Sequence, residues 1–285
     1  MDNKQFMKKL EELKGSIDGK IKEFLENSEE LKKFIQFREQ HFYNYSIRNN
    51  ILIYNQNPTA SLVAGFRKWQ ELGYRVKKGE KAINILVPLI VKKEIPEEEA
   101  GKPKEYVYGY KYASVFDISQ TEATEGAREI PEIDTRMKQS SKSIYTSKDL
   151  FFKTKEIVEQ YLPINIEKDL VPRGETDGKT ITLKKDKCVA MAGTLMHEFT
   201  HYLNHFEEKR KVTKNQIETE AEIGAMIYGS YFNLDISGKY KYLAFYKEGI
   251  KLDEAFDTAL SSFEQLLYGT MGKKGLIDLL EEEEK

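Results

Sequence analysis

Hydrophobic positions at the start of the chain recur every three or four residues, which predicts an amphipathic helix over residues 4–26. The apolar residues with this spacing are Phe6, Leu10, Leu13, Ile17, Ile21 and Phe24. Ser28 is placed to cap a second helix that ends near His41. A third helix is predicted over residues 45–56, because Pro58 follows directly and disfavours further helix.

A change from helical to extended patterning follows a short predicted helix over residues 67–72. Residues 83–91 and 106–118 are strand-like, and a charged loop with two prolines separates them. The pair predicts an antiparallel hairpin with a long loop.

Four tyrosines in the second of these strands share parity, so an extended chain places them on one face. They are Tyr106, Tyr108, Tyr110 and Tyr112. Such a row would serve as a stacking platform for unpaired bases. The alternative is a sheet face that is buried under a helix.

A polar segment divides the chain. Residues 121–143 are rich in Glu, Ser and Thr and have no hydrophobic period, which predicts a linker. We therefore predict a domain over 1–122, a linker over 123–143 and a domain over 144–285. The second half shows a helix near 148–162, short strands near Ile164 and over 179–183, and then mostly helices. The expected fold class is α+β, with helices and an antiparallel sheet in the first domain and a helical second domain with a small sheet.

The strongest chemical signal is the H-E-x-x-H pattern His197-Glu198-Phe199-Thr200-His201, within a helix predicted over 189–206. Four residues advance a helix by about 400°, so His197 and His201 project from one face and can bind one Zn²⁺. Glu198 lies beside the first ligand, where it can act as general base on a water molecule.

A catalytic zinc site needs a third protein ligand and keeps one position open. Glu218, in a helix predicted over 216–228, is the preferred ligand, and Glu222, one turn later, would orient a histidine through its free ring N–H. Glu220 points almost to the opposite side of that helix. His205 is an alternative ligand, or it supports a ligand or faces the substrate. The alternative to a ligand role is that the three glutamates lie on a solvated helix face.

Such a site would hydrolyse peptide bonds, with Glu198 removing a proton from zinc-bound water and returning it to the leaving amine. The strand over 179–183 is expected to offer its edge to an extended peptide. Candidates for oxyanion stabilisation are Tyr202, Tyr228 and Tyr231. A structural zinc site is the alternative; such sites favour cysteine, and the single Cys188 is badly placed nine residues before His197.

Charge is distributed unevenly along the 285 residues. The net charge is −2, yet residues 38–93 hold ten Lys or Arg and three acidic residues, a net +7 that leaves −9 for the remainder. We expect one basic functional surface on an otherwise acidic protein.

Short motifs in both halves resemble one family, the ArdC-type antirestriction proteins. The motifs that resemble its single-stranded-DNA-binding domain are Tyr45–Asn49, Val63–Gln70, Leu72-Gly73, Val76–Ile83 and Val115–Thr121. Thr194–Met196 and Ala221–Ala225, around the H-E-x-x-H pattern, resemble the zincin-like metallopeptidase domain that follows it. The resemblance covers roughly residues 30 to 235 and implies a mobile-element protein that binds single-stranded DNA entering a cell and blocks restriction.

The basic residues fit that DNA role, because lysine and arginine contact phosphates without reading sequence. The expected DNA-binding residues are Arg48, Arg67, Lys68, Trp69, Tyr74, Arg75, Lys77, Lys78 and Lys81. Trp69 and Tyr74 would stack on bases, although a lone Trp in this context is often part of the core.

Two other functions remain open at this point. One is a pure single-stranded-DNA-binding protein whose metal site only stabilises the fold. The other is a peptidase that cleaves a regulator protein, like the ImmA and IrrE proteins, in which the basic domain recognises a protein. In the favoured case the cofactor is Zn²⁺, and the partners are single-stranded DNA and an unknown protein substrate.

Composition narrows the class of protein. One cysteine excludes a disulfide framework. The most apolar run, residues 83–91, is far shorter than the roughly 20 residues of a membrane helix, and the charged N-terminus lacks the apolar stretch of a signal peptide. We expect a soluble, cytoplasmic protein without a membrane partner.

Overall fold

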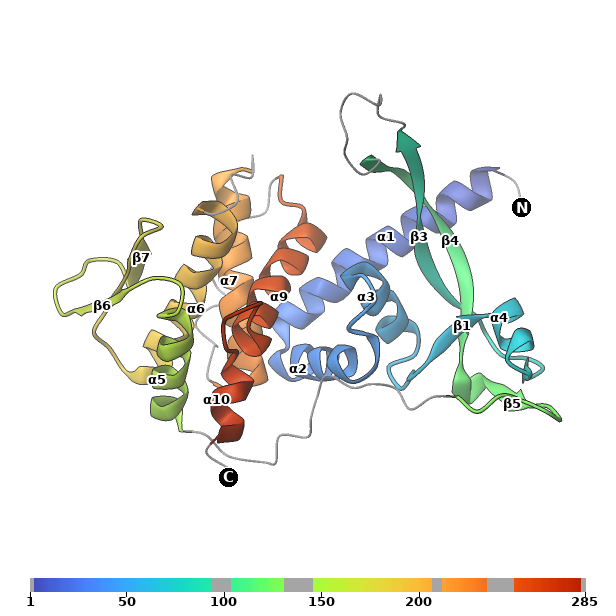
Figure 1. The fold of residues 1–285 in the computed structure, drawn as a ribbon. Coiled ribbons are helices and arrows are strands. Elements are labelled where there is room, and N and C mark those ends of the chain that lie inside the picture. The colour runs from blue at the N-terminus through green and yellow to red at the C-terminus, as the bar shows by residue number, and fades with distance from the viewer. Residues whose placement is uncertain (1–2, 94–103, 131–145, 207–211, 235–248, 283–285) are drawn as a thin grey trace, which may run out of the picture. The chain divides into compact units, whose positions relative to one another are not determined.

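The computed structural model describes residues 3–93, 104–130, 146–206, 212–234 and 249–282. They form two compact units, residues 1–20 with 36–137 and residues 21–35 with 138–285. We call these the N-terminal and the C-terminal unit (Figure 1). Both combine helices with small sheets, so the predicted α+β fold class is confirmed. Among the described residues, no helix is both long and apolar enough to span a membrane.

The first two helices contribute to both units. Helix α1 spans Asn3–Glu26 and buries the predicted apolar stripe from Leu10 to Phe24. Helix α2 spans Ser28–Phe37 and continues as a π-helical turn, Arg38–Phe42. The predicted cap at Ser28 is wrong by one residue, because the Asn27 side chain accepts the Glu30 N–H (3.1 Å).

Three strands form the main sheet of the N-terminal unit. Strand β4 (Lys104–Asp117) lies between β1 (Val63–Gly65) and β3 (Ile83–Lys93), and both pairings are antiparallel. The predicted hairpin of β3 and β4 is confirmed. Helix α4 (Phe66–Glu71) follows β1, and β2 (Tyr74–Val76) pairs with β5 (Thr121–Ala123). The predicted linker therefore begins with a paired strand rather than an irregular segment.

Helix α3 (Ile47–Gln56) covers the free edge of β3 with two amide side chains. The Asn49 side chain bonds the backbone N–H and C=O of Leu86 (2.8 and 2.9 Å), and Gln56 does the same for Asn84 (2.9 and 2.9 Å). These side chains satisfy edge groups that would otherwise offer a pairing template. The motif that contains Asn49 thus has a structural role in this unit.

The predicted tyrosine row is interrupted by a bulge. The register of β3 and β4 shifts between Leu89 and Ile90, which leaves Tyr108 without a paired residue. An extra residue breaks the strict alternation of side chains between the two faces. Tyr110 and Tyr112 retain the predicted common parity, whereas the side chains of Tyr106 and Tyr108 lie outside the described residues.

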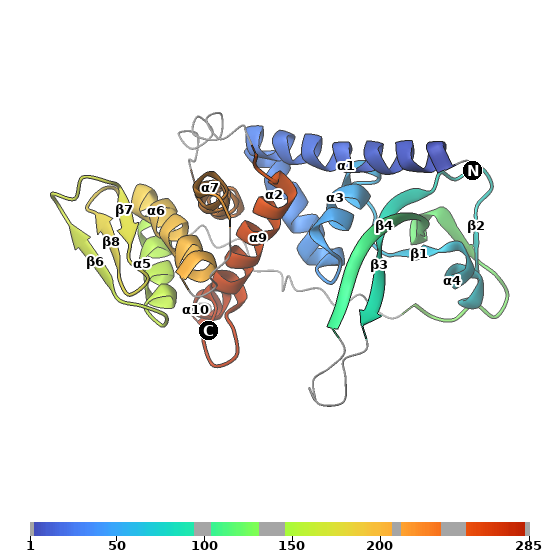
Figure 2. The same ribbon diagram turned by 90° about the horizontal axis from the view of Figure 1, so that it is seen from above.

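The C-terminal unit packs helices against one face of a three-stranded sheet (Figure 2). Strand β8 (Ile181–Lys184) is central, with β6 (Ile164–Glu167) parallel and β7 (Gly174–Thr176) antiparallel to it. Besides residues 21–35 of α1 and α2, the described helices of this unit are α5 (Ser147–Val158), α6 (Cys188–His201), α7 (Lys214–Tyr231), α9 (Leu252–Tyr268) and α10 (Leu276–Glu282). A π-helical turn, Tyr202–Phe206, continues α6.

Residues 21–35 belong to this second unit because their aromatic side chains are part of its core. Phe24 and Phe34 are stacked at 4.5 Å, and each ring centroid lies 6.1 Å from that of Phe256 on α9. All three residues are fully buried. The predicted division at residues 122 and 143 does not anticipate this contribution from the N-terminal helices.

Candidate metal centre

Helix α6 presents its two histidines to a glutamate of α7. His197 Nε2 and His201 Nε2 lie 3.1 Å apart, and Glu218 Oε2 lies 3.8 and 3.7 Å from them. One ligand atom from each residue falls within 4.8 Å of the others. Their side chains are 13%, 11% and 31% exposed, so solvent reaches the cluster on the side of Glu218.

The electrostatics of this cluster favour a cation. Interaction with the His201 ring lowers the pKa of Glu218, so its carboxyl group stays ionised in neutral solution. Glu222 lies one turn further along α7, with Oε1 3.7 Å from His197 Nδ1. Glu222 is thus near the ring nitrogen that faces away from the cluster, where a carboxylate can orient a ligating imidazole.

Glu198 is buried next to His197, under the backbone of β7. A Cβ atom at Gly174 would lie 3.1 Å from Glu198 Oε1 and 2.6 Å from Thr194 Cγ2. Only a glycine fits at this crossing without displacing a neighbour. Strand β7 therefore runs directly beside the carboxylate that the sequence marks as the general base.

His205 lies outside the cluster of His197, His201 and Glu218 and contacts the ring nitrogen of His201 that faces away from that cluster. His205 Nδ1 lies 3.2 Å from His201 Nδ1, and His205 Nε2 lies 3.0 Å from Glu220 Oε2. Glu220 lies on the opposite side of α7 from Glu218, as its spacing predicts, and no role for it follows from the sequence. Glu220 has His205 as a partner there because the π-helical turn brings His205 to that side of α7. Glu220 is fully buried, and the sequence alone gives no sign of this burial.

Two further predictions about the site are corrected. The segment 179–183 is not an edge, because β8 has a partner strand on each side; β6 and β7 are the edges among the described strands. Tyr228 is fully buried, with its hydroxyl 2.7 Å from Thr154 Oγ1, and burial raises the pKa of its phenol. A phenol held against α5 in this way is not available to an oxyanion. Tyr202 and Tyr231 pack against other aromatic rings.

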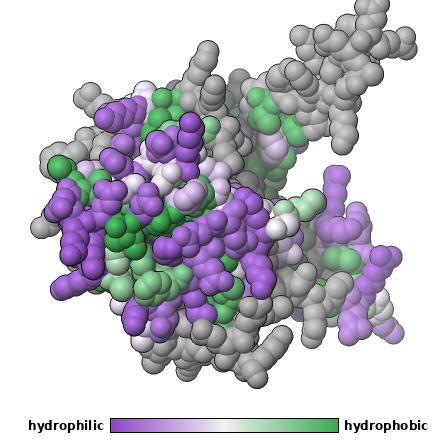
Figure 3. Space-filling view, turned by 60° about the vertical axis from the view of Figure 1, so that its left-hand side comes forward, coloured by the Kyte–Doolittle hydropathy of each residue, from purple (hydrophilic) through white to green (hydrophobic). Residues whose placement is uncertain are grey.

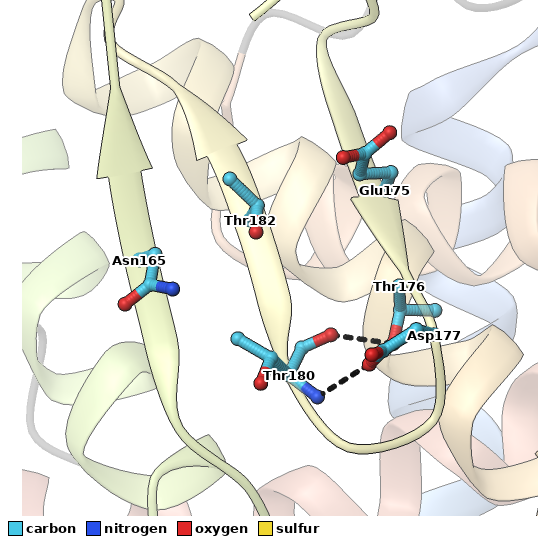
Figure 4. A pocket seen from close by; sticks show the side chains of 6 residues that line it. All are labelled: Asn165, Glu175, Thr176, Asp177, Thr180 and Thr182. Carbon is cyan, nitrogen blue, oxygen red and sulfur yellow. Dashed lines mark hydrogen bonds between the residues drawn. The ribbon is translucent and has the colours of Figure 1, made fainter.

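A pocket of about 420 Å³ lies elsewhere on the C-terminal unit (Figure 4). Its lining residues are Asn165, Glu175, Thr176, Asp177, Thr180 and Thr182. Ile181 and Leu183, which alternate with the threonines of β8, are fully buried, so the pocket is on the outer face of the sheet. Figure 3 shows this end of the unit, with hydrophilic residues around a smaller hydrophobic area. The pocket contains no histidine or cysteine and is distinct from the His–Glu cluster.

The residues expected to contact DNA fall into two groups. Trp69 is 1% exposed and donates its ring N–H to the Phe116 carbonyl (2.9 Å), so the expectation that it stacks on a base is wrong. Its ring fills the core between α4 and the sheet. Tyr74 is half-buried, with its ring centroid 5.7 Å from that of Trp69.

The basic side chains differ in whether they already form ion pairs or hydrogen bonds within the protein. Arg75 bonds Glu122 through two of its nitrogens, Nε at 2.9 Å and Nη2 at 2.5 Å, and Lys68 lies 3.3 Å from Glu71. Lys77 donates to the Ser119 carbonyl (2.8 Å), and Arg48 donates to the Tyr110 hydroxyl (2.9 Å). The exposed residues Arg67, Lys78 and Lys81 have no ion pair among the described side chains. They are the members of the set best placed to meet phosphates.

The match to a known family decides the nature of the N-terminal region. The model of the N-terminal domain of the anti-restriction factor ArdC matches residues 7–116. This part of the chain is therefore similar to an ArdC-type N-terminal domain. The resemblance drawn from the sequence is therefore confirmed for the ArdC-type domain, while the zincin-like resemblance of the second half remains a prediction.

Individual relatives are more distant. An uncharacterized protein of Bacillus anthracis, pXO2-81, is 28% identical over 150 residues, 45% of this chain. This chain spans a quarter of the length of that relative (25%). The metal-free crystal structure of the antirestriction protein ArdC from plasmid R388 has 21% identity and a TM-score of 0.46, covering 81% of this chain and 88% of that one. Its Mn(II)-bound structure has 18% identity and a TM-score of 0.40, covering 90% and 96%. Both TM-scores lie below 0.5, and we draw no conclusion from them.

Proposed function

We propose that the C-terminal unit is a zinc-dependent peptidase with His197, His201 and Glu218 as ligands. The observation that carries the proposal is the convergence of two imidazoles and one ionised carboxylate within 4.8 Å. Two histidines and one glutamate are a donor set of catalytic zinc sites, which keep one position for water or substrate, whereas structural sites fill all four positions and favour cysteine. When bound, Zn²⁺ supplies Lewis acidity and makes water a nucleophile near neutral pH.

The residues around the cluster have distinct roles in this proposal. Glu198 accepts a proton from the attacking water and delivers it to the leaving amine. Its burial under β7 keeps the carboxylate in one place. Glu222 Oε1, 3.7 Å from His197 Nδ1, would accept the proton of that nitrogen after a small approach and would so leave Nε2 of the ring to the metal.

The peptide is proposed to bind along β7. This strand is an edge of the described sheet, and its Gly174 lies against Glu198. An extended peptide that pairs with the edge through backbone hydrogen bonds would pass close to the general base. The chain would thus bind protein segments by backbone pairing, which is tolerant of sequence.

We propose that the ArdC-type domain binds single-stranded DNA and that the chain acts against restriction. The family match supports this proposal, as do the exposed Arg67, Lys78 and Lys81. Phosphate contacts of this kind provide affinity without base specificity. A regulator-cleaving peptidase whose basic domain binds protein instead would show no salt-dependent affinity for an oligonucleotide.

The experiment combines zinc titration with two substitutions in the full chain. Glu198→Gln should retain Zn²⁺ and lose hydrolysis of a quenched fluorescent peptide library, whereas Glu218→Ala should lose both. Equal zinc affinity in Glu218→Ala and in the wild type would contradict the ligand assignment. If Glu198→Gln keeps full hydrolysis, Glu198 is not the general base. If the zinc-loaded wild type hydrolyses nothing, the enzymatic proposal is wrong and a structural metal site is favoured.

A further inference from the structure

A network of hydrogen-bonded, buried polar groups runs from His201 Nδ1 to the start of α9. It passes through His205, Glu220 and Gln216 and ends at the backbone of Lys251. We infer that this network is a positioning relay that holds the proton of His201 on Nδ1 and leaves Nε2 free for the metal. The inference about metal binding rests on the proposed function, whereas the proton arrangement can be tested without metal.

The direction of the hydrogen bonds is set at Lys251. The Lys251 N–H donates to Gln216 Oε1 (3.0 Å), and Gln216 Nε2 approaches the Lys251 carbonyl (3.3 Å). A backbone N–H is always a donor and a carbonyl always an acceptor, so the Gln216 amide has one satisfactory orientation. Its NH₂ group must therefore face Glu220 Oε1, which lies 3.1 Å away.

Glu220 transmits that direction to the two rings. An ionised carboxylate only accepts, so His205 must carry a proton on Nε2, which lies 3.0 Å from Glu220 Oε2. A neutral His205 then has a lone pair on Nδ1, 3.2 Å from His201 Nδ1. His201 must donate from Nδ1, and its Nε2 keeps the lone pair that a metal needs. That nitrogen is the one that faces His197 and Glu218.

Burial makes a reversed arrangement costly. Glu220 is fully buried, Gln216 is 5% exposed, and the His205 side chain is 7% exposed. Two donors or two acceptors that face each other there would each lose a hydrogen bond that water cannot replace. The relay therefore fixes the tautomer of His201 through the imidazole of His205. The Glu220 carboxylate acts on His201 only through that second ring.

The decisive variant is Glu220→Gln, which keeps the shape of the side chain. Gln216 keeps its orientation, because Lys251 holds it, so we expect the new amide to accept from Gln216 and to donate to His205 Nε2. His205 then carries its proton on Nδ1 and donates to His201, whose own proton moves to Nε2. We expect the Zn²⁺ dissociation constant to rise by roughly 10- to 100-fold. Glu175→Gln, the same change on the outer face of the sheet, should leave it unaltered.

The measurement is nitrogen NMR of ¹⁵N-histidine in the metal-free full chain at about pH 8, where ordinary imidazoles are neutral. The chain has four histidines, so few signals need assignment. The wild type should show His201 protonated on Nδ1 and His205 on Nε2, and Glu220→Gln should show both reversed.

Other outcomes overturn the relay. A wild-type His201 with its proton on Nε2 would do so, and this result does not depend on whether the variant folds. An unchanged His201 tautomer and zinc affinity in a folded Glu220→Gln protein would do so as well. A wild type that binds no Zn²⁺ but has the expected tautomers would support the relay and contradict the zinc proposal.

Discussion

Gly224 on α7 lies directly against Thr200 on α6, so closely that a Cβ atom at position 224 would be 2.5 Å from Thr200 Oγ1. The glycine lets the two helix backbones approach each other beside the H-E-x-x-H turn. Because Glu218 and Glu222 lie on the same helix as Gly224, this contact sets how near they come to His197.

Replacing Gly224 by alanine should separate the helices and weaken the metal centre. Overpacking of this kind costs about 1–3 kcal/mol, and the outward shift of α7 should raise the Zn²⁺ dissociation constant. Urea unfolding and zinc titration measure the two effects. Gly193→Ala on α6 is the matched control, since no heavy atom lies within 4 Å of its added Cβ; it should stabilise the helix by about 0.5–1 kcal/mol. Equal behaviour of the two variants would contradict the role of Gly224.

Gly174→Ala should disturb Glu198 rather than the ligands. The added methyl group would press on Thr194 Cγ2 at 2.6 Å and on Glu198 at 3.1 Å. We expect slower hydrolysis with zinc affinity within a factor of about three, because neither His197 nor His201 is among the nearest neighbours of the added Cβ. The double variant with Thr194→Ser removes the closest atom and should recover much of the rate. A loss of rate that Thr194→Ser does not relieve would show that the strand acts in another way.

DNA affinity should depend on the exposed lysines and not on the buried tryptophan. Lys78→Gln and Lys81→Gln should each weaken binding of a single-stranded oligonucleotide and lower the salt slope of the binding constant by about 0.7–1. Trp69→Phe removes the hydrogen bond to the Phe116 carbonyl and should cost about 1–3 kcal/mol of stability without changing that slope. The slope is read from titrations at several salt concentrations. A lower salt slope of the binding constant in Trp69→Phe would contradict this assignment and favour a direct contact between Trp69 and DNA.

The turn between β7 and β8 should lose stability in acid. Backbone N–H groups of Lys179 and Thr180 donate to Asp177 Oδ1 (2.8 Å each) and hold the pKa of this carboxyl below its ordinary value. Figure 4 shows the bond from Thr180. A carboxyl group with a lowered folded-state pKa stabilises the fold above its unfolded pKa, about 3.9, and loses this contribution as the pH falls through the folded value. The stability difference between wild type and Asp177→Asn should therefore shrink between about pH 5 and pH 2. A difference that is constant over this range would contradict the assignment.

Local patterning was sufficient to predict the main helices and the placement of His197 and His201 on one helix face. The stripe from Leu10 to Phe24 has the spacing of one helix face, and four residues between His197 and His201 bring both rings to one side of any helix. Both relationships depend only on the geometry of a single element. The same holds for the β3–β4 hairpin, whose register was nevertheless altered by the bulge at Tyr108.

Relationships between elements were decided by packing in three dimensions. Trp69 has the same sequence context whether it is exposed or buried, and its burial depends on a sheet whose strand β4 ends at Asp117, far along the chain. Glu220 and His205 meet because α7 crosses the π-helical turn after α6, and no period within either helix encodes that crossing. A helix repeat specifies which residues share a face, but the partner of that face follows from which arrangement buries the most apolar area while every polar group keeps a hydrogen bond.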